Sequence, residues 1–187
     1  MIKFYYGTMG AGKTTELLKT YDIYKRKGKK PLIIKSNIDN REGDFNGWGV
    51  TSSRITKDKA PAYYYTDIKD IKDFDFGVLL VDEAQFCSRK DIDFICKYAD
   101  ENNIDVLSYG LKTDVNGNLF FGAERWLALA DEIKELENLC QVDGCMNKAV
   151  AHKRFINGKA DNSTKSVVID KENVTYLSVC RKHWRDL

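Results

Sequence analysis

An octapeptide near the start of the chain has the residue types and spacing of a phosphate-binding loop. Residues 7–14, Gly-Thr-Met-Gly-Ala-Gly-Lys-Thr, fit the pattern G-x-x-x-x-G-K-[ST] between an apolar run and an expected helix. Glycines let backbone N–H groups turn inward around phosphate oxygens, and the amino terminus of a helix favours negative charge. Lys13 would neutralise the β- and γ-phosphates, and the Thr14 hydroxyl is a suitable Mg²⁺ ligand. The expected ATP and Mg²⁺ contacts are Gly7, Thr8, Met9, Gly10, Ala11, Gly12, Lys13 and Thr14.

Two adjacent acids follow an apolar run and form the second candidate group. The run 78–81, Val-Leu-Leu-Val, ends at Asp82 and Glu83. A carboxylate at the carboxyl end of a parallel strand lies where open α/β sheets bind ligands, so we expect Asp82 to hold Mg²⁺. Side chains alternate along an extended chain, so Glu83 would point elsewhere, free of metal, and accept a proton from a hydroxyl or water. The alternative is that this acid pair caps the next helix.

Three cysteines and one histidine have the spacing of a zinc site. Cys140-x4-Cys145 and Cys180-x2-His183 supply two pairs of soft ligands, as in a tetrahedral structural zinc site that is fully occupied by protein. The alternative is a set of scattered buried cysteines with a surface histidine. Cys87 and Cys96 lack partners at suitable spacing, so we interpret them as thiols that pack in the core.

Composition and charge exclude several classes of protein. The chain has 187 residues, of which 43% are hydrophobic and 31% charged, so it is neither disordered nor collagen-like. No apolar run approaches the roughly 20 residues of a membrane span, and no signal peptide is visible. These features predict a cytoplasmic protein in a reducing compartment, where an odd number of cysteines, 5, argues for metal ligation and buried thiols rather than disulfides. Residues 140–187 contain nine Lys/Arg and five Asp/Glu, a local charge of +4 against +2 for the chain.

Alternating strand-like and helix-like segments must position these groups. Short buried strands are expected at 2–6, 32–35, 78–81 and 106–109, and helices at 13–27, 90–101 and 123–137. This order is typical of βαβ units with a parallel sheet, hence an α/β fold. Residues 37–60 break the pattern and predict a long loop, which is usually functional or mobile. Strand packing is expected for residues 63–65, three consecutive tyrosines.

A change of character after Leu139 predicts a second, smaller domain. Short alternating runs at 167–169 and 174–179, polar turns and most of the cysteines lie there. We expect a nucleotide-binding α/β domain at 1–137 and a zinc-binding domain at 138–187.

The motifs together resemble the zinc-containing, cytosolic-type thymidine kinases. The resemblance runs in order over nearly the whole chain through 7–14, Ile38-Asp-Asn-Arg41, Ser52-Ser-Arg-Ile55, Val81-Asp-Glu-Ala-Gln-Phe86, Tyr109-Gly-Leu-Lys-Thr-Asp114, Phe121-Gly122 and Tyr176-x3-Cys180-Arg-Lys-His183. It implies a RecA-like P-loop domain with a parallel sheet and a small zinc domain whose lasso loop closes over the nucleoside. It further implies transfer of the γ-phosphoryl group of ATP to the 5′-hydroxyl of thymidine or deoxyuridine, a homotetramer, and feedback inhibition by dTTP.

The resemblance also assigns roles to individual residues. It implies Glu83 as the general base, Lys13 and Arg41 as catalytic residues near the phosphates, and Asp82 with Thr14 at Mg²⁺. The implied nucleoside contacts are Met9, Phe86, Leu111, Val115, His152, Val167 and Tyr176. Apolar walls suit a flat base because stacking and shape exclude water. The lasso segment 168–176 lacks the paired glycines of the family, so the preferred nucleoside is not predicted.

Two other functions remain open at this point. A P-loop ATPase whose zinc domain binds nucleic acid would use the basic segment 140–187, where Phe155 and Trp184 lie among the charges. A nucleotide-binding regulator without catalysis would not need Glu83. We favour the kinase, with no nucleic acid and no membrane as partner.

Overall fold

Two sheets organise the chain in this computed structural model, which describes residues 1–36, 43–45, 47–161, 163 and 173–187. The larger has eight strands in the order β3-β4-β5-β2-β6-β7-β1-β8, and the smaller has three in the order β10-β9-β11. The strands are β1 (Ile2–Tyr6), β2 (Pro31–Ser36), β3 (Gly43–Phe45), β4 (Trp48–Ser52), β5 (Lys59–Tyr65), β6 (Val78–Asp82), β7 (Asp105–Gly110), β8 (Glu132–Glu135), β9 (Ala151–Ile156), β10 (Lys159–Ala160) and β11 (Val174–Val179). The helices are α1 (Lys13–Arg26), α2 (Arg89–Asn102), α3 (Phe121–Leu129) and α4 (Arg181–Asp186), with 3₁₀ turns η2 (Ile68–Asp73) and η3 (Ala84–Phe86).

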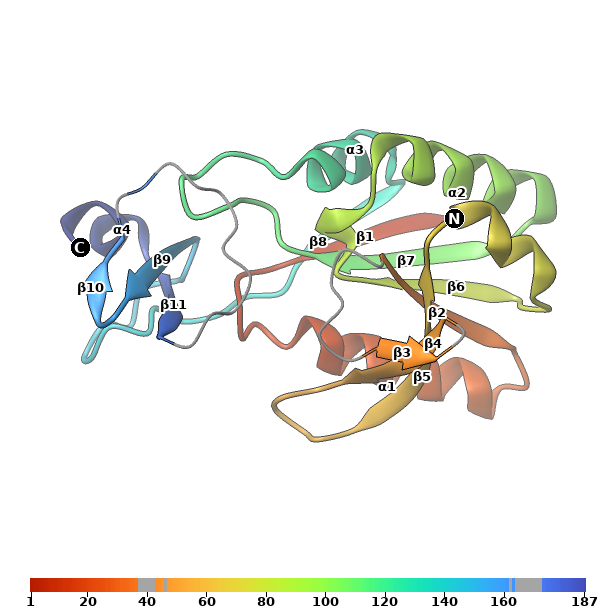
Figure 1. Cartoon of the computed structure of the whole chain (residues 1–187), viewed down its shortest axis with the longest axis horizontal. Coiled ribbons are helices and arrows are strands. Elements are labelled where there is room, and N and C mark those ends of the chain that lie inside the picture. Colours follow the sequence, from red (N-terminus) through yellow and green to blue (C-terminus); the bar gives the residue numbers. More distant parts are fainter. Residues whose placement is uncertain (37–42, 46, 162, 164–172) are drawn as a thin grey trace.

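Strands β5, β2, β6, β7, β1 and β8 pair in parallel, which confirms the expected α/β fold. Strand β6 is buried along its whole length and divides its apolar side chains between two cores. Val78 and Leu80 pack with Leu17 of α1, whereas Leu79 and Val81 pack with Ile92 of α2 and neighbouring residues of α3. Figure 1 shows α1 on one side of the sheet and α2 with α3 on the other. This double covering explains the unbroken apolar run in the sequence.

The expected helix at 123–137 is wrong in its second half. The helix predicted at 123–137 ends at Leu129, because the chain turns and residues 132–135 pair in parallel with β1 as an edge strand. Asp131 fixes this change, since its carboxylate accepts from the Ile2 N–H and its own N–H donates to the Ile2 carbonyl. The alternating charges of 132–135 resemble an exposed helix face, but they belong to an exposed strand.

The expected long loop at 37–60 contains regular structure. Strand β4 pairs antiparallel with β3 and with β5, so a hairpin extends the sheet at its edge. Trp48 packs against Tyr63 and Phe74, which anchors the hairpin. The three tyrosines 63–65 lie in β5 and pack as expected.

The smaller sheet lies beside the carboxyl ends of the parallel strands (Figure 1). Two hydrogen bonds show the contact between the two parts. The Trp184 indole N–H donates to the Val115 carbonyl at 3.0 Å, and the Met9 N–H donates to His152 at 2.9 Å. The smaller sheet therefore borders the edge where ligands of open α/β sheets bind.

Candidate active site

The glycine-rich loop, residues 7–14, joins β1 to α1 through a tight turn. Gly12 has φ +77°, a conformation that side chains rarely adopt, and a Cβ on Gly7 would lie 2.5 Å from a backbone oxygen. The Lys13 side chain turns back toward the loop, and its ammonium donates to the carbonyls of Gly7 at 3.2 Å and Thr8 at 2.8 Å. A glycine-rich turn with an adjacent lysine ammonium is typical of anion-binding loops.

Three charged groups from the two sequence motifs meet beside this loop. Burial lowers the pKa of Lys13, and the negative charges of Glu83 and Asp82 oppose that shift. These electrostatic effects require Asp82 and Glu83 to be close to the Lys13 ammonium. The structure therefore brings together the loop and the acid pair, as the sequence predicts.

Asp82 is a buried carboxylate with fixed oxygens. Its Oδ1 accepts from the Glu83 N–H at 3.0 Å, its Oδ2 accepts from the Thr51 hydroxyl at 3.3 Å, and Lys35 Nζ lies 3.8 Å from Oδ2. Burial and the charge of Glu83 raise the pKa of Asp82 to about 6, although Lys35 lowers it. A carboxylate and the Thr14 hydroxyl are hard oxygen donors, which fit Mg²⁺ rather than a soft metal.

Glu83 departs from the geometry expected from strand alternation. Strand β6 ends at Asp82, and Glu83 has φ 49° and ψ 43°, in the left-handed region that costs a non-glycine residue energy. Its side chain is half-buried, and Oε2 accepts a 2.6 Å hydrogen bond from Gln85 Nε2. Strain at such a position is typical of functional sites.

Gln85 holds Glu83 in place, a role that the sequence reasoning missed. The Gln85 side chain is buried, and its Oε1 accepts from the Leu111 N–H at 3.0 Å while its Nε2 donates to Glu83. Gly110 permits this contact, because a Cβ there would lie 2.8 Å from Gln85 Oε1. The motif contains Gln85, but its partner Leu111 is 26 residues away and carries no signal for the pairing.

The residues expected to line a nucleoside pocket come from three parts of the fold. Phe86 of η3 packs edge-on against Phe120, with ring centroids 6.0 Å apart. Leu111 and Val115 follow β7 and contact Gln85 and Trp184 through their main chains. Three further expected contacts lie in the described part of the chain, namely Met9 in the glycine-rich loop, His152 in β9 and Tyr176 in β11. Arg41 and Val167 lie outside the described residues.

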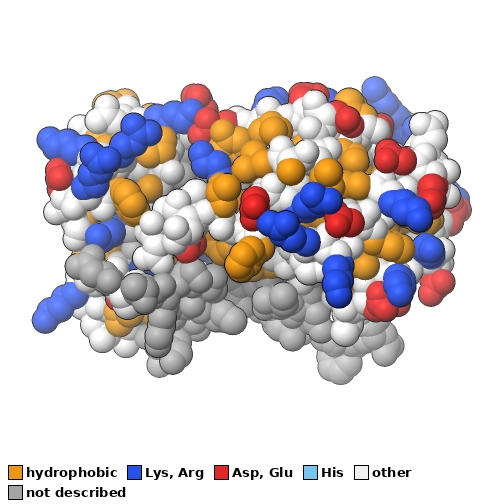
Figure 2. Space-filling view, turned by 90° about the horizontal axis from the view of Figure 1, so that it is seen from above, with side chains coloured by type: hydrophobic (Ala, Val, Ile, Leu, Met, Phe, Trp, Pro, Cys, Tyr) orange, Lys and Arg blue, Asp and Glu red, His pale blue; other side chains and the backbone are white. Residues whose placement is uncertain are grey.

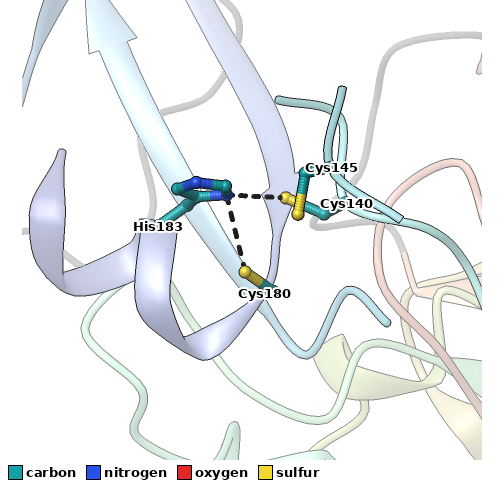
Figure 3. A group of neighbouring side chains, drawn as sticks. All are labelled: Cys140, Cys145, Cys180 and His183. Carbon is teal, nitrogen blue, oxygen red and sulfur yellow. Dashed lines mark hydrogen bonds between the residues drawn. The ribbon is translucent and has the colours of Figure 1, made fainter. Parts of the chain in front are cut away.

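The expected metal ligands form one cluster at the base of the smaller sheet (Figure 3). The ligand atoms of Cys140, Cys145, Cys180 and His183 all lie within 4.8 Å of one another. His183 turns Nδ1 toward the sulfurs of Cys140 at 3.3 Å and Cys180 at 3.5 Å. The pKa of the Cys180 thiol is lowered, mainly because the backbone N–H of His183 donates a hydrogen bond to its sulfur. Three sulfurs and one imidazole nitrogen at these distances fit a tetrahedral Zn²⁺.

The four-residue spacer between the first two cysteines closes through a turn. The Cys145 N–H donates to the Val142 carbonyl at 3.0 Å, and Gly144 has φ +73°. The turn brings Cys145 back toward Cys140, so the long spacer does not separate the ligands.

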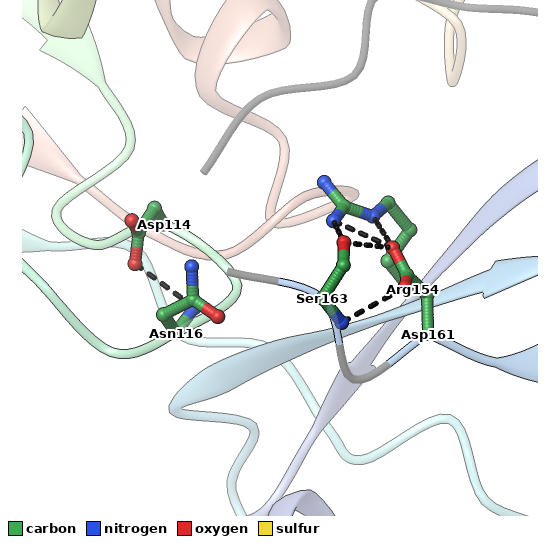
Figure 4. Close-up of polar contacts among 5 residues, drawn as sticks. All are labelled: Asp114, Asn116, Arg154, Asp161 and Ser163. Atoms are coloured by element: carbon green, nitrogen blue, oxygen red, sulfur yellow. Dashed lines mark hydrogen bonds and ion pairs between the residues drawn. The ribbon is translucent and has the colours of Figure 1, made fainter. Parts of the chain in front are cut away.

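One positive charge of the basic segment is buried in the smaller sheet. Arg154 is 0% exposed and bonds Asp161 at 2.6 Å and the Ser163 hydroxyl at 3.0 Å (Figure 4). Its Nη1 has no hydrogen-bond partner within the part of the chain that the structure describes. A buried guanidinium paired with a carboxylate adds no positive potential to a surface that could bind nucleic acid.

Comparisons with known proteins point to one family. A family model described as thymidine kinase matches residues 1–184. A thymidine kinase of Streptococcus pyogenes serotype M3 is 37% identical over 185 residues, which cover 96% of this chain and 94% of the relative. A thymidine kinase of Streptococcus agalactiae serotype Ia shows the same identity and the same coverage.

Proposed function

Since this chain belongs to the thymidine kinase family, we propose that it transfers the γ-phosphoryl group of ATP to the 5′-hydroxyl of thymidine, with Glu83 as the general base. One observation carries the proposal. The charges of Glu83 and Asp82 both raise the pKa of Lys13 against the effect of its burial, so the proposed base, the cation of the loop and the proposed metal-binding carboxylate interact with one another. Family membership supports an ATP-dependent kinase that acts in thymidine salvage.

The chain's own residues would perform the transfer mainly by positioning. The amides of the glycine-rich loop and the Lys13 ammonium bind the phosphates and hold the γ-phosphorus in line with the nucleoside. Glu83, oriented by Gln85, accepts the proton of the 5′-hydroxyl as the hydroxyl oxygen attacks the γ-phosphorus, and the bond from the γ-phosphorus to the bridging oxygen breaks to release ADP. Thr14 and Asp82 would hold Mg²⁺, which supplies neutralisation of the charge on the phosphate oxygens. Arg41 is proposed as a further cation near the phosphates.

The nucleoside would bind between the larger sheet and the smaller one. Its proposed contacts are Met9, Phe86, Leu111, Val115, His152, Val167 and Tyr176. Deoxyuridine is proposed as a second substrate, because its sugar presents the same 5′-hydroxyl. We propose a boundary between residues 137 and 138, which lies between the last strand of the large sheet and the first strand of the small one.

Further family properties remain proposals for this chain. We infer a homotetramer, feedback inhibition by dTTP and a cytoplasmic location, with Zn²⁺ in the Cys₃His cluster as a structural metal. No helix within the described part of the chain is long and apolar enough to cross a membrane.

Nucleic-acid-dependent ATP hydrolysis is the less favoured function. Over the larger sheet, the face in Figure 2 shows Lys and Arg side chains close to Asp and Glu, rather than grouped by sign. The burial of Arg154 removes a further charge from the surface of the smaller sheet. Neither feature supports the extended basic surface that nucleic acid requires.

A product assay tests the proposed function. Radiolabelled thymidine and MgATP are incubated with the full-length, zinc-loaded chain, with and without single-stranded DNA. We expect thymidine monophosphate at the same rate in both conditions. No monophosphate, together with ATP hydrolysis that DNA accelerates, would contradict the proposal.

A further inference from the structure

The main chain of Met9, the third residue of the glycine-rich loop, is held from outside the loop on both sides of its Cα. His152 Nε2 accepts from the Met9 N–H at 2.9 Å. The Met9 carbonyl accepts from the Ser178 hydroxyl at 2.7 Å and from Asn138 Nδ2 at 3.0 Å. All three partners lie at least 129 residues away in the sequence, and two of them belong to the smaller sheet.

His152 and Ser178 form one unit of the smaller sheet. They lie directly opposite each other in the antiparallel register of β9 and β11, so their side chains share a face. Both are buried. Burial, the largest cause, and the charge of Lys13 lower the pKa of His152 to about 4, although the Thr113 backbone and Asp114 oppose that shift. The imidazole is therefore neutral at pH 7, with a lone pair on Nε2 for the Met9 N–H.

Ser178 also connects Met9 to the Cys₃His cluster. The Ser178 N–H donates to Gln141 Oε1 at 2.6 Å, and the Gln141 N–H donates to the Ser178 carbonyl at 2.9 Å. Gln141 directly follows the ligand Cys140, and Ser178 lies two residues before the ligand Cys180. A shift of the segment that carries Cys140 or of the segment that carries Cys180 would be transmitted to the Met9 carbonyl through these hydrogen bonds.

We propose that His152 and Ser178 are positioning residues through which the smaller sheet fixes the shape of the glycine-rich loop that grips the triphosphate. The inference rests on the proposed function of that loop. The Met9 N–H donates to His152, so this amide fixes the loop and is not itself free for a phosphate. An anion site made of backbone amides depends on preorganisation, because each misplaced amide loses its bond to phosphate.

The test measures binding of MgATP to metal-loaded full-length variants, without catalysis. We expect His152→Leu to raise the Kd about 10-fold or more, because it leaves the Met9 N–H without its partner. Ser178→Ala should raise the Kd less, because Asn138 still donates to the Met9 carbonyl. His152→Gln should restore most of the affinity, since an amide oxygen can accept from the Met9 N–H. Thr175→Ala, an exposed position on the same strand, serves as the control. Zinc content and melting temperature are measured for every variant.

Steady-state kinetics separate this role from a direct contact with the nucleoside. A positioning role for His152 raises KM for ATP more than KM for thymidine. Unchanged ATP affinity in metal-loaded His152→Leu, or an increase confined to KM for thymidine, would overturn the inference while leaving the kinase function intact. Failure of the wild-type chain to bind MgATP would instead contradict the proposed function, and the inference would fall with it.

Discussion

Asp82 is the carboxylate that we propose as a Mg²⁺ ligand, so its ionisation would decide whether the cation binds. Its carboxyl group has a pKa raised to about 6 by burial and by the neighbouring Glu83. Below that pH the group is protonated and loses its affinity for Mg²⁺. We expect kcat/KM for MgATP to fall as the pH decreases through about 6, measured with saturating thymidine between pH 5 and 8.

A matched pair of variants checks that this fall in kcat/KM at acid pH, the acid limb of the pH profile, is due to Asp82. Asp82→Asn should lower activity severely and remove the limb from what remains. Asp75→Asn, which alters an exposed ion pair with Lys30, should keep the wild-type profile. If the acid limb persists in Asp82→Asn, it belongs to another group.

The same pKa has a consequence for stability. A folded-state pKa above the ordinary value of 3.8 means that folding favours protonated Asp82, so the contribution of Asp82 to stability is largest below pH 3.8. The contribution is lost as the pH rises through about 6. Asp82→Asn should therefore raise the melting temperature at pH 8 by about 2–4 °C and have less effect at pH 4. The opposite order would show that the ion pair with Lys35 outweighs burial.

At the scale of elements, η3 is locked by close backbone approach. A Cβ on Gly122 of α3 would lie 2.6–2.8 Å from the carbonyl oxygens of Gln85, Ala84 and Cys87. The Trp126 indole N–H also donates to the Ala84 carbonyl at 3.1 Å. Helix α3 therefore holds the turn that carries Glu83 and Gln85.

Gly122→Ala should move η3 and disturb Glu83. We expect a loss of about 1–3 kcal/mol in the free energy of unfolding, measured by urea denaturation, and a lower kcat. Gly77→Ala is the control, because a Cβ there meets only the flexible Lys29 side chain at 3.8 Å. Equal stability of the two variants would argue against the locked turn.

The elements differ in how well the sequence predicts them. Strand β6 and helices α1 and α2 agree with prediction, because burial on two faces or on one helical stripe leaves a clear apolar pattern. Strand β8 was predicted as helix, since an exposed edge strand depends on pairing with β1 that no local pattern records. The acid pair and the metal ligands were predicted from local spacing. Gln85 and Ser178 were missed because their partners are 26 and 169 residues away.

At the scale of the whole molecule, the Cys₃His cluster joins the segment before β9 to the segment after β11, at one end of the smaller sheet. Cys140 and Cys145 precede β9, whereas Cys180 and His183 follow β11. In this small core, a bound metal would supply much of the stability. Ser178 and Asn138 donate to the Met9 carbonyl and His152 accepts from the Met9 N–H, so the smaller sheet and the segment before it are bonded directly to the glycine-rich loop.

Cys180→Ser should release the metal and unfold the smaller sheet. Elemental analysis is expected to give about one zinc per wild-type chain and little in the variant, with a lower melting temperature. Cys96→Ser, which changes a buried thiol of α2 outside the cluster, should keep its zinc. Wild-type protein without zinc, after expression with the metal supplied, would contradict the assignment.

The central claim is that Glu83 acts as the base beside the glycine-rich loop, and a single-turnover experiment with Glu83→Gln tests it most directly. Excess enzyme is mixed with MgATP and labelled thymidine, and the rate of monophosphate formation is followed at saturating nucleoside. The account predicts a rate about 10²-fold or more below wild type with nearly unchanged ATP affinity, because the amide binds Gln85 but accepts no proton. A rate within a few-fold of wild type would contradict it.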